Sequence, residues 1–229
     1  MTTGSSADDG GRASFRRGLG VGVPFGVVGF LLSVSFGVLA RQAGFSVVQA
    51  SVTAMIVFAG SAQFAALSVI TVGGGIPAAL TAGSLMNARF LAMGIALAPS
   101  LPGGPMKRAA QGQAVVDSSW ALANRGDGTF DRWLLFGTTL PQYLTWTLGS
   151  VVGAIFGNAL GDTHRLGLDA IYPVFFLSLL IAELRDASSR WVAVGGGLLA
   201  LALVPISPPG VPILAASAVT LIGLVRRSR

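Results

Sequence analysis

Long stretches of the chain carry no Asp, Glu, Lys or Arg. Six of them cover most of the 229 residues: 18–40, 42–88, 90–106, 133–161, 170–182 and 191–225. An α-helix rises about 1.5 Å per residue, so about 20 apolar residues cross a hydrocarbon core about 30 Å thick. Each of the longer stretches is therefore long enough to cross the membrane once or twice as a helix. The pattern predicts an all-α polytopic membrane protein.

Glycine and proline clusters divide these stretches into about seven transmembrane helices. The run Gly73–Gly75 and the proline-rich segment 99–105 separate the second, third and fourth helices. The predicted helices cover about 20–40, 47–72, 76–97, 133–157, 168–184, 191–204 and 211–225, with a short helical pattern at 109–123 inside the linker 98–132. Residues 1–18 are small and polar, which predicts a disordered tail before a transporter domain over 19–229.

Matching residues at a nearly constant spacing indicate an internal repeat. Pro24 and Pro141 lie 117 residues apart, as do Gly44 and Gly161. The repeat pairs about 20–97 with about 133–204 and leaves 211–225 as an extra helix. Each unit then holds three helices, an odd number, so the halves are expected to have opposite orientations. This is the 3+3 inverted repeat of secondary transporters, with its site at mid-membrane between the halves.

Composition excludes several classes of protein. Charged residues make up 10% of the chain, against roughly 25% in soluble domains. With no cysteine and a single histidine, His164, the chain offers no thiolate or His-rich metal site, and we expect no metal and no cofactor. The net charge of +6 comes from bases between apolar segments, which suits a lipid bilayer and not nucleic acid.

The bases also bear on orientation. On the seven-helix plan ten of them fall on the side of the carboxyl terminus, and four, including Arg16 and Arg17, fall on the other side. The positive-inside rule then favours a cytoplasmic carboxyl terminus, although the arginines beside the first helix favour the reverse.

Polar groups inside the apolar stretches are the candidates for function, because each is costly in hydrocarbon unless it faces a cavity or a partner. Gly60, Ser61 and Gln63 lie near the middle of the predicted second helix. A helix break there would expose backbone groups and helix-end dipoles to a substrate. The alternative is close helix packing, with Gln63 bonded across an interface.

Two charged positions form the second group. Arg89, with Asn87 beside it, is the only charge between 42 and 106, and its guanidinium suits a substrate carboxylate. An ion pair with Asp117 or Glu183 is the alternative, and we slightly favour it. Asp117 itself either caps the short helix or faces the cavity, and capping is the safer interpretation.

Glu183 is the candidate for proton coupling, with Asp117 as a second. Under the repeat Glu183 mirrors Gln63, and a carboxylate in a partly dry cavity can load and release a proton during transport. A solvated cluster with Arg185, Asp186 and Arg190 at the helix end is at least as good an interpretation.

The chain resembles the AzlC family, the large subunit of bacterial branched-chain amino acid exporters. The resemblance is sharpest at 57–67 (VFAGSAQFAAL) and extends over 24–26, 36–44, 87–90, 96–99 and 117–122. Two positions depart from the family pattern: Phe90, where histidine is common, and Ser118, where an acidic residue is common. A mechanism that needs either group is therefore in doubt for this chain.

The resemblance implies an exporter of valine, leucine and isoleucine in the bacterial plasma membrane, working with a small AzlD-like membrane subunit. The residues alone indicate only a polytopic, transporter-like protein, which we expect not to be an enzyme. No phosphate-binding loop motif is present, so an ion gradient, most simply of protons, would drive transport. The alternatives are an intramembrane serine hydrolase built on Ser61 and His164, and a glycine-packed scaffold that transports nothing.

Overall fold

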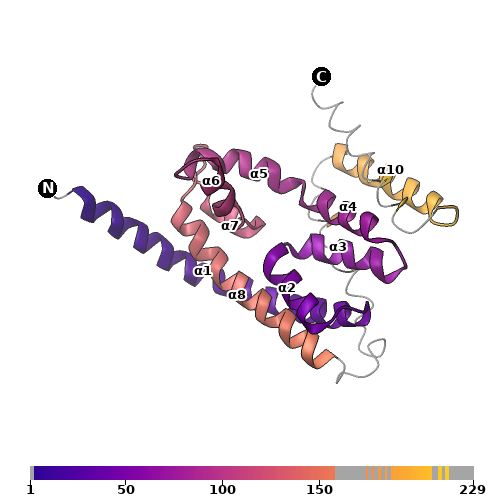
Figure 1. Ribbon diagram of the computed structural model, residues 1–229. Helices are drawn as coiled ribbons and strands as arrows, with labels where there is room; N and C mark the ends of the chain where they lie inside the picture. The colour runs from indigo at the N-terminus through magenta and orange to yellow at the C-terminus, as the bar shows by residue number, and fades with distance from the viewer. Residues whose placement is uncertain are drawn as a thin grey trace. The chain divides into compact units, whose positions relative to one another are not determined.

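The computed structural model describes residues 3–157 and, beyond them, only 174, 177, 180, 181, 184, 187–207, 211, 212, 215 and 216. Over these residues the secondary structure is helical, apart from an isolated bridge between Asn124 and Phe130 (Figure 1). This confirms the all-α fold for the described part. The chain divides into two compact units: the first comprises Met1–Ala59 and Ala88–Ala159, the second Gly60–Asn87 and Leu160–Arg229.

The helices follow the predicted positions closely, with two differences. The first unit contains α1 (Thr3–Gln42), α2 (Val47–Val57), α5 (Arg89–Leu97), α6 (Pro105–Gly112), α7 (Asp117–Ala123) and α8 (Arg132–Phe156); the second contains α3 (Gly60–Thr71), α4 (Ile76–Asn87) and α10 (Ala187–Leu203). The predicted helices 47–72 and 76–97 are each broken in the middle, at 58–59 and at Ala88. Predicted helices 168–184 and 211–225 fall largely outside the described residues.

Helix α1 begins much earlier than expected. The predicted disordered tail over 1–18 is helical from Thr3, so this prediction is wrong for the described part. The polar turns extend a helix that the apolar residues after Gly18 already nucleate, which removes the nucleation cost. They also gain contacts with α8, because the Ser14 hydroxyl donates a 2.9 Å hydrogen bond to the Asp131 carboxylate.

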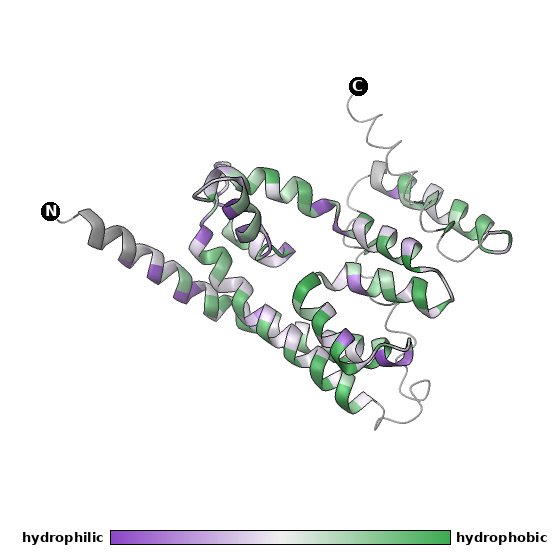
Figure 2. Cartoon of the chain, in the orientation of Figure 1, coloured by the Kyte–Doolittle hydropathy of each residue, from purple (hydrophilic) through white to green (hydrophobic). Residues whose placement is uncertain are grey.

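Glycines bring α1 and α8 into close contact along their length. A Cβ added at Gly18, Gly22 or Gly37 of α1, or at Gly137, Gly149 or Gly153 of α8, would lie under 3.0 Å from the facing helix. Small residues four apart on each helix are the usual means by which membrane helices approach closely. Figure 2 shows mostly apolar and small residues along this helix pair, and hydrophilic positions in the early turns of α1.

The two helices run in the same direction. Gly18 meets Leu134, and Gly37 meets Ser150, so rising residue numbers on α1 match rising numbers on α8. The inverted repeat pairs these two helices and predicts opposite directions, so α1 and α8 do not support it. A parallel pair also places the arginines in the early turns of α1 and those around the start of α8 at one end, whereas the seven-helix plan put them on opposite sides.

Length and composition identify few complete crossings among the described residues. The segment Asp9–Gln42 of α1 is long and apolar enough by itself, and α4 with the segment Arg89–Ser100 passes as a broken pair. Helices α2, α3 and the segment Arg190–Leu203 are apolar but shorter than a span. The prediction of about seven spans therefore stays a prediction.

The second unit is described mainly through a helical hairpin. Helices α3 and α4 pack through alanines, with Ala65, Ala79 and Ala82 buried in their contact. The turn between them begins at Gly73, whose φ of +85° lies in the left-handed region that glycine adopts without strain. The hairpin joins the first unit at both helix breaks.

Candidate functional site

The first break places the end of α2 beside the middle of α8. Helix α2 ends at Phe58, which has left-handed backbone dihedrals, φ 32° and ψ 48°. The Tyr143 hydroxyl donates a hydrogen bond of 3.2 Å to the Met55 carbonyl, and the Phe58 and Tyr143 rings meet edge to face, with centroids 5.0 Å apart. Tyr143 is close to the midpoint of α8, so the break lies at mid-depth if α8 crosses the membrane.

An ion pair occupies the start of α5. Arg89 Nη2 lies 2.9 Å from Asp117 Oδ2, and the two side chains are 35% and 59% exposed. This is the ion pair that the sequence analysis favoured. Asp117 is the first residue of α7, and Val116 occupies the capping position, so the capping role expected for Asp117 is not observed.

The ion pair lies at the same level of α8 as the break in α2. Ser118, next to Asp117, donates a hydrogen bond of 2.9 Å to Gln142 Oε1, and Gln142 precedes Tyr143. The segment 105–123, expected to be a linker, therefore reaches the middle of α8. In hydrocarbon a half-exposed ion pair is costly, so this pair requires a water-filled cavity or a further part of the protein beside it.

Helices α2 and α5 cover opposite halves of α8. Helix α2 runs along α8 from its carboxyl-terminal end to Tyr143. Helix α5 begins near the level of Gln142 and ends at Leu97, which lies in one buried cluster with Leu135 of α8. In the chain they are separated by Gly60–Asn87, and α2 by itself is apolar but shorter than a span. Broken helices at mid-depth are the usual binding elements of secondary transporters.

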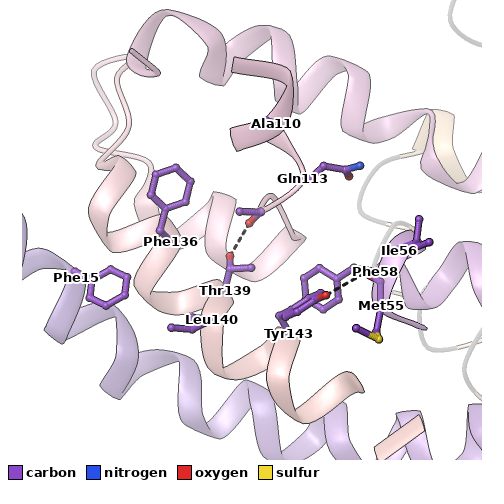
Figure 3. Close-up of a pocket in the computed structure, with 11 residues that line it drawn as sticks. Phe15, Met55, Ile56, Phe58, Ala110, Gln113, Phe136, Thr139, Leu140 and Tyr143 are labelled. Atoms are coloured by element: carbon purple, nitrogen blue, oxygen red, sulfur yellow. Dashed lines mark hydrogen bonds between the residues drawn. The ribbon is translucent and has the colours of Figure 1, made fainter. Parts of the chain in front are cut away.

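A pocket of about 490 Å³ opens beside this break (Figure 3). Its volume lies within the usual range for small-molecule sites, about 300–1,000 Å³. None of the described residues that line it is charged, and its polar groups include the Tyr143 hydroxyl and the Thr139 hydroxyl, which donates to the Ala114 carbonyl at 2.7 Å. The remaining lining residues are Phe15, Met55, Ile56, Phe58, Ala110, Gln113, Ala114, Phe136 and Leu140.

The other predicted site residues fall in the second unit or outside the described residues. Gly60, Ser61 and Gln63 form the first turn of α3, where Ser61 and Gln63 are buried, and Asn87 ends α4. These residues therefore flank the two helix breaks, as the expected break near Gly60 requires. Glu183 and His164 lie outside the described residues.

Both departures from the family pattern are part of the site. Phe90 lies under the Arg89 guanidinium, with 5.2 Å between its ring centroid and Arg89 Cζ. The Ser118 hydroxyl donates its hydrogen bond to Gln142 Oε1. The uncharged residues at these positions thus support the ion pair and the contact with α8.

The sequence analysis proposed none of the residues that line the pocket, and it also missed Gln142. Gln142 and Tyr143 are polar residues inside the charge-free stretch 133–161, the same signal that identified Gln63. Phe58 offers no such signal, because its left-handed backbone is visible only in three dimensions.

A capping carboxylate fixes the start of α8. Asp131 accepts hydrogen bonds from the backbone N–H groups of Trp133 and Leu134, both 3.1 Å long, and lies 3.3 Å from Arg125. Partial burial acts to raise the pKa of Asp131, but the hydrogen bonds from Leu134 and Ser14 and the Arg125 guanidinium outweigh it and lower the pKa.

Comparison with known proteins places the chain in a family. The model of the family described as AzlC protein matches residues 24–160, more than half of the chain. The branched-chain amino acid transport protein AzlC of Bacillus subtilis is 27% identical over 188 residues, covering 80% of this chain and 73% of the relative. An uncharacterized membrane protein of Archaeoglobus fulgidus is 29% identical over 208 residues, covering 90% and 91%.

The inner membrane protein YgaZ of Escherichia coli is a further relative, 24% identical over 195 residues, covering 80% of this chain and 78% of the relative. No solved structure matches the chain significantly. The matched region contains α2, the two helix breaks, the Arg89–Asp117 pair and nearly all of α8. The chain is a membrane protein that belongs to the AzlC family.

Proposed function

We propose that this protein transports branched-chain amino acids across the bacterial plasma membrane, as the large subunit of an exporter. Membership of the AzlC family supports the proposal, since a relative carries the name of a branched-chain amino acid transport protein. The observation that carries it further is the apolar pocket beside the broken helix, which suits an aliphatic side chain.

The lining of the pocket favours a branched aliphatic group over a charged or strongly polar one. Six large apolar side chains line it and contribute carbon surface: Phe15, Met55, Ile56, Phe58, Phe136 and Leu140. Each CH₂ that such a pocket removes from water contributes about 0.8 kcal/mol, so leucine gains over alanine by about 2 kcal/mol. This difference amounts to about thirtyfold in affinity.

The ammonium group of the substrate belongs at the carboxyl end of α2. The last four carbonyl groups of a helix lack partners within the helix, and they carry the negative end of its dipole. Met55 and Ile56 belong to that turn and line the pocket, and Tyr143 already donates to the Met55 carbonyl. The helix end therefore offers acceptors beside an apolar volume.

Arg89 completes the proposal as the group that attracts the substrate carboxylate. Arg89 is paired with Asp117, and the substrate carboxylate can compete with Asp117 for the same guanidinium. Gly60, Ser61, Gln63 and Asn87 are proposed to contribute polar contacts at the two breaks.

Proton coupling through Glu183, with Asp117 as the alternative, and a small AzlD-like subunit complete the proposed mechanism. Replacing Glu183 by Gln removes the titratable group and keeps a similar shape. We expect efflux by Glu183→Gln to lose its dependence on the pH gradient while substrate exchange continues. An unchanged pH dependence, at equal amounts of inserted protein, would assign the coupling elsewhere.

Counterflow in proteoliposomes tests the transport function. Vesicles that contain the purified protein, with or without the small subunit, are loaded with unlabelled leucine and diluted into labelled leucine. We expect transient accumulation of label, competition by external isoleucine and valine, and no competition by lysine or aspartate. If labelled leucine accumulated neither with nor without the small subunit, the proposed transport function would be wrong.

A further inference from the structure

A second hollow lies near the amino-terminal ends of α1 and α8. Its volume is about 300 Å³, and it is lined by Gly11, Arg12, Phe15 and Arg16 of α1 and by Trp133 of α8. Arg12 and Arg16 are one helical turn apart, so their guanidinium groups lie on one face of α1. The hollow thus combines two cations with two aromatic rings.

This hollow lies where the charged residues of both helices end and their apolar stretches begin. In α1 the last charge before the apolar stretch is Arg17, and in α8 it is Arg132, which directly precedes Trp133. The Arg132 guanidinium lies 5.2 Å from the Trp133 ring centroid. Tryptophan beside arginine at the end of an apolar stretch is typical of the headgroup region of a bilayer.

Close packing keeps the Trp133 ring against α1. A Cβ added at Gly11 would lie 2.7 Å from Trp133 Nε1, so a larger residue at this place would displace the ring. The neighbouring acid Asp131 is engaged with Ser14, Arg125 and the backbone of α8, and it does not line the hollow. Arg12 is also preceded along α1 by Asp8 and Asp9, one helical turn earlier, so Arg16 is the guanidinium of the hollow that lies farthest from an acid on its own helix.

We propose that this hollow binds the phosphate headgroup of an anionic phospholipid. Arg16, with Arg12, holds the phosphate, and the first carbons of the acyl chains lie against Phe15 and Trp133. Five arginines gather at this end of the first unit: Arg12, Arg16, Arg17, Arg125 and Arg132. By the positive-inside rule this end faces the cytoplasm, where anionic headgroups attract cationic side chains.

Bromine quenching of Trp133 tests the proposal with the full-length protein. Two vesicle preparations contain the same ratio of phosphatidylglycerol to phosphatidylcholine, with bromine on the acyl chains of one lipid or of the other. The Trp133 signal is the difference between the wild type and Trp133→Phe. We expect stronger quenching when phosphatidylglycerol carries the bromine.

Matched variants separate a site from general attraction to the surface. The attraction between one arginine and an anionic headgroup in contact with it amounts to about fivefold in affinity. Arg16→Gln should therefore reduce the quenching preference about fivefold, while Arg17→Gln, which removes the same charge outside the hollow, should retain it. Gly11→Ala should also abolish the preference, and Gly10→Ala, which has open space around it, should not.

Three results would overturn the proposal. Equal quenching by both brominated lipids would show that the hollow has no preference for anionic headgroups. Equal losses in Arg16→Gln and Arg17→Gln would assign the preference to surface charge. Loss of the preference on addition of inorganic phosphate would identify a soluble anion, and not a lipid, as the ligand.

Discussion

The contact between α1 and α8 predicts a large penalty for one added methyl group. Gly153→Ala places a Cβ 2.9 Å from the carbonyl carbon of Val34 and closer still to its oxygen. Both atoms belong to the backbone, so no side-chain rotation relieves the clash and the helices must separate. Overpacking of this kind costs about 1–3 kcal/mol.

Gly20→Ala is the matched control, because it adds the same methyl group to α1 where nothing lies within 4 Å. Alanine is a better helix former than glycine by up to about 1 kcal/mol, so this variant should be as stable as the wild type or more so. The free energy of unfolding of both variants can be measured by titrating the detergent-solubilised protein with a denaturing detergent. Equal stability of Gly153→Ala and Gly20→Ala would refute the close packing of α1 on α8.

Further predictions concern the site, the cap of α8 and the orientation. Gln63→Leu should impair leucine counterflow while insertion continues, because it removes a buried polar group; normal counterflow would make Gln63 a packing residue. Asp131→Ala should cost about 1 kcal/mol of unfolding free energy at neutral pH by removing a helix cap. The pKa of Asp131 is lowered in the folded state, so the charged carboxylate stabilises the protein at pH values above its unfolded pKa, and this stabilisation is lost as the pH falls through the lowered pKa. If the unfolding free energy of wild type and Asp131→Ala fell in the same way with decreasing pH, this account would be wrong. In this cysteine-free chain, an impermeant maleimide should label Gln42→Cys in intact cells but Ala13→Cys only after permeabilisation, and the reverse pattern would place the amino terminus outside.

The sequence analysis predicted helix positions well because charge-free stretches and glycine or proline clusters act locally. Predicted helix 133–157 corresponds to α8 at Arg132–Phe156, while the helix predicted over 47–72 is interrupted at 58–59, as one of the two interpretations of Gly60 allowed. The Arg89–Asp117 pair was also predictable, because an isolated arginine in an apolar stretch needs an anionic partner.

What could not be predicted depends on contacts between distant segments. Lys107 and Arg108 give the segment 105–123 the composition of a surface loop, yet Ser118 reaches Gln142 in the middle of α8. The early turns of α1 are polar, and they are helical as the extension of the apolar helix that follows, with contacts to the start of α8 from Gly11 onwards. The direction of α8 relative to α1 follows from which glycines face each other, and the spacing of glycines alone does not specify it.

Substrate selection by the pocket beside the α2 break is the central claim, and a filled pocket tests it most directly. Leu140→Trp puts a large ring on the wall of the pocket, while Leu144→Trp adds the same ring one turn further along α8, at a position outside the pocket that is 57% exposed. Labelled leucine and labelled alanine are compared by counterflow in proteoliposomes containing equal amounts of each protein. We expect Leu140→Trp to lose the roughly thirtyfold advantage of leucine over alanine that burial of three carbons provides, with Leu144→Trp indistinguishable from the wild type. Retention of the full leucine preference in Leu140→Trp would contradict the claim that this pocket receives the side chain of the substrate.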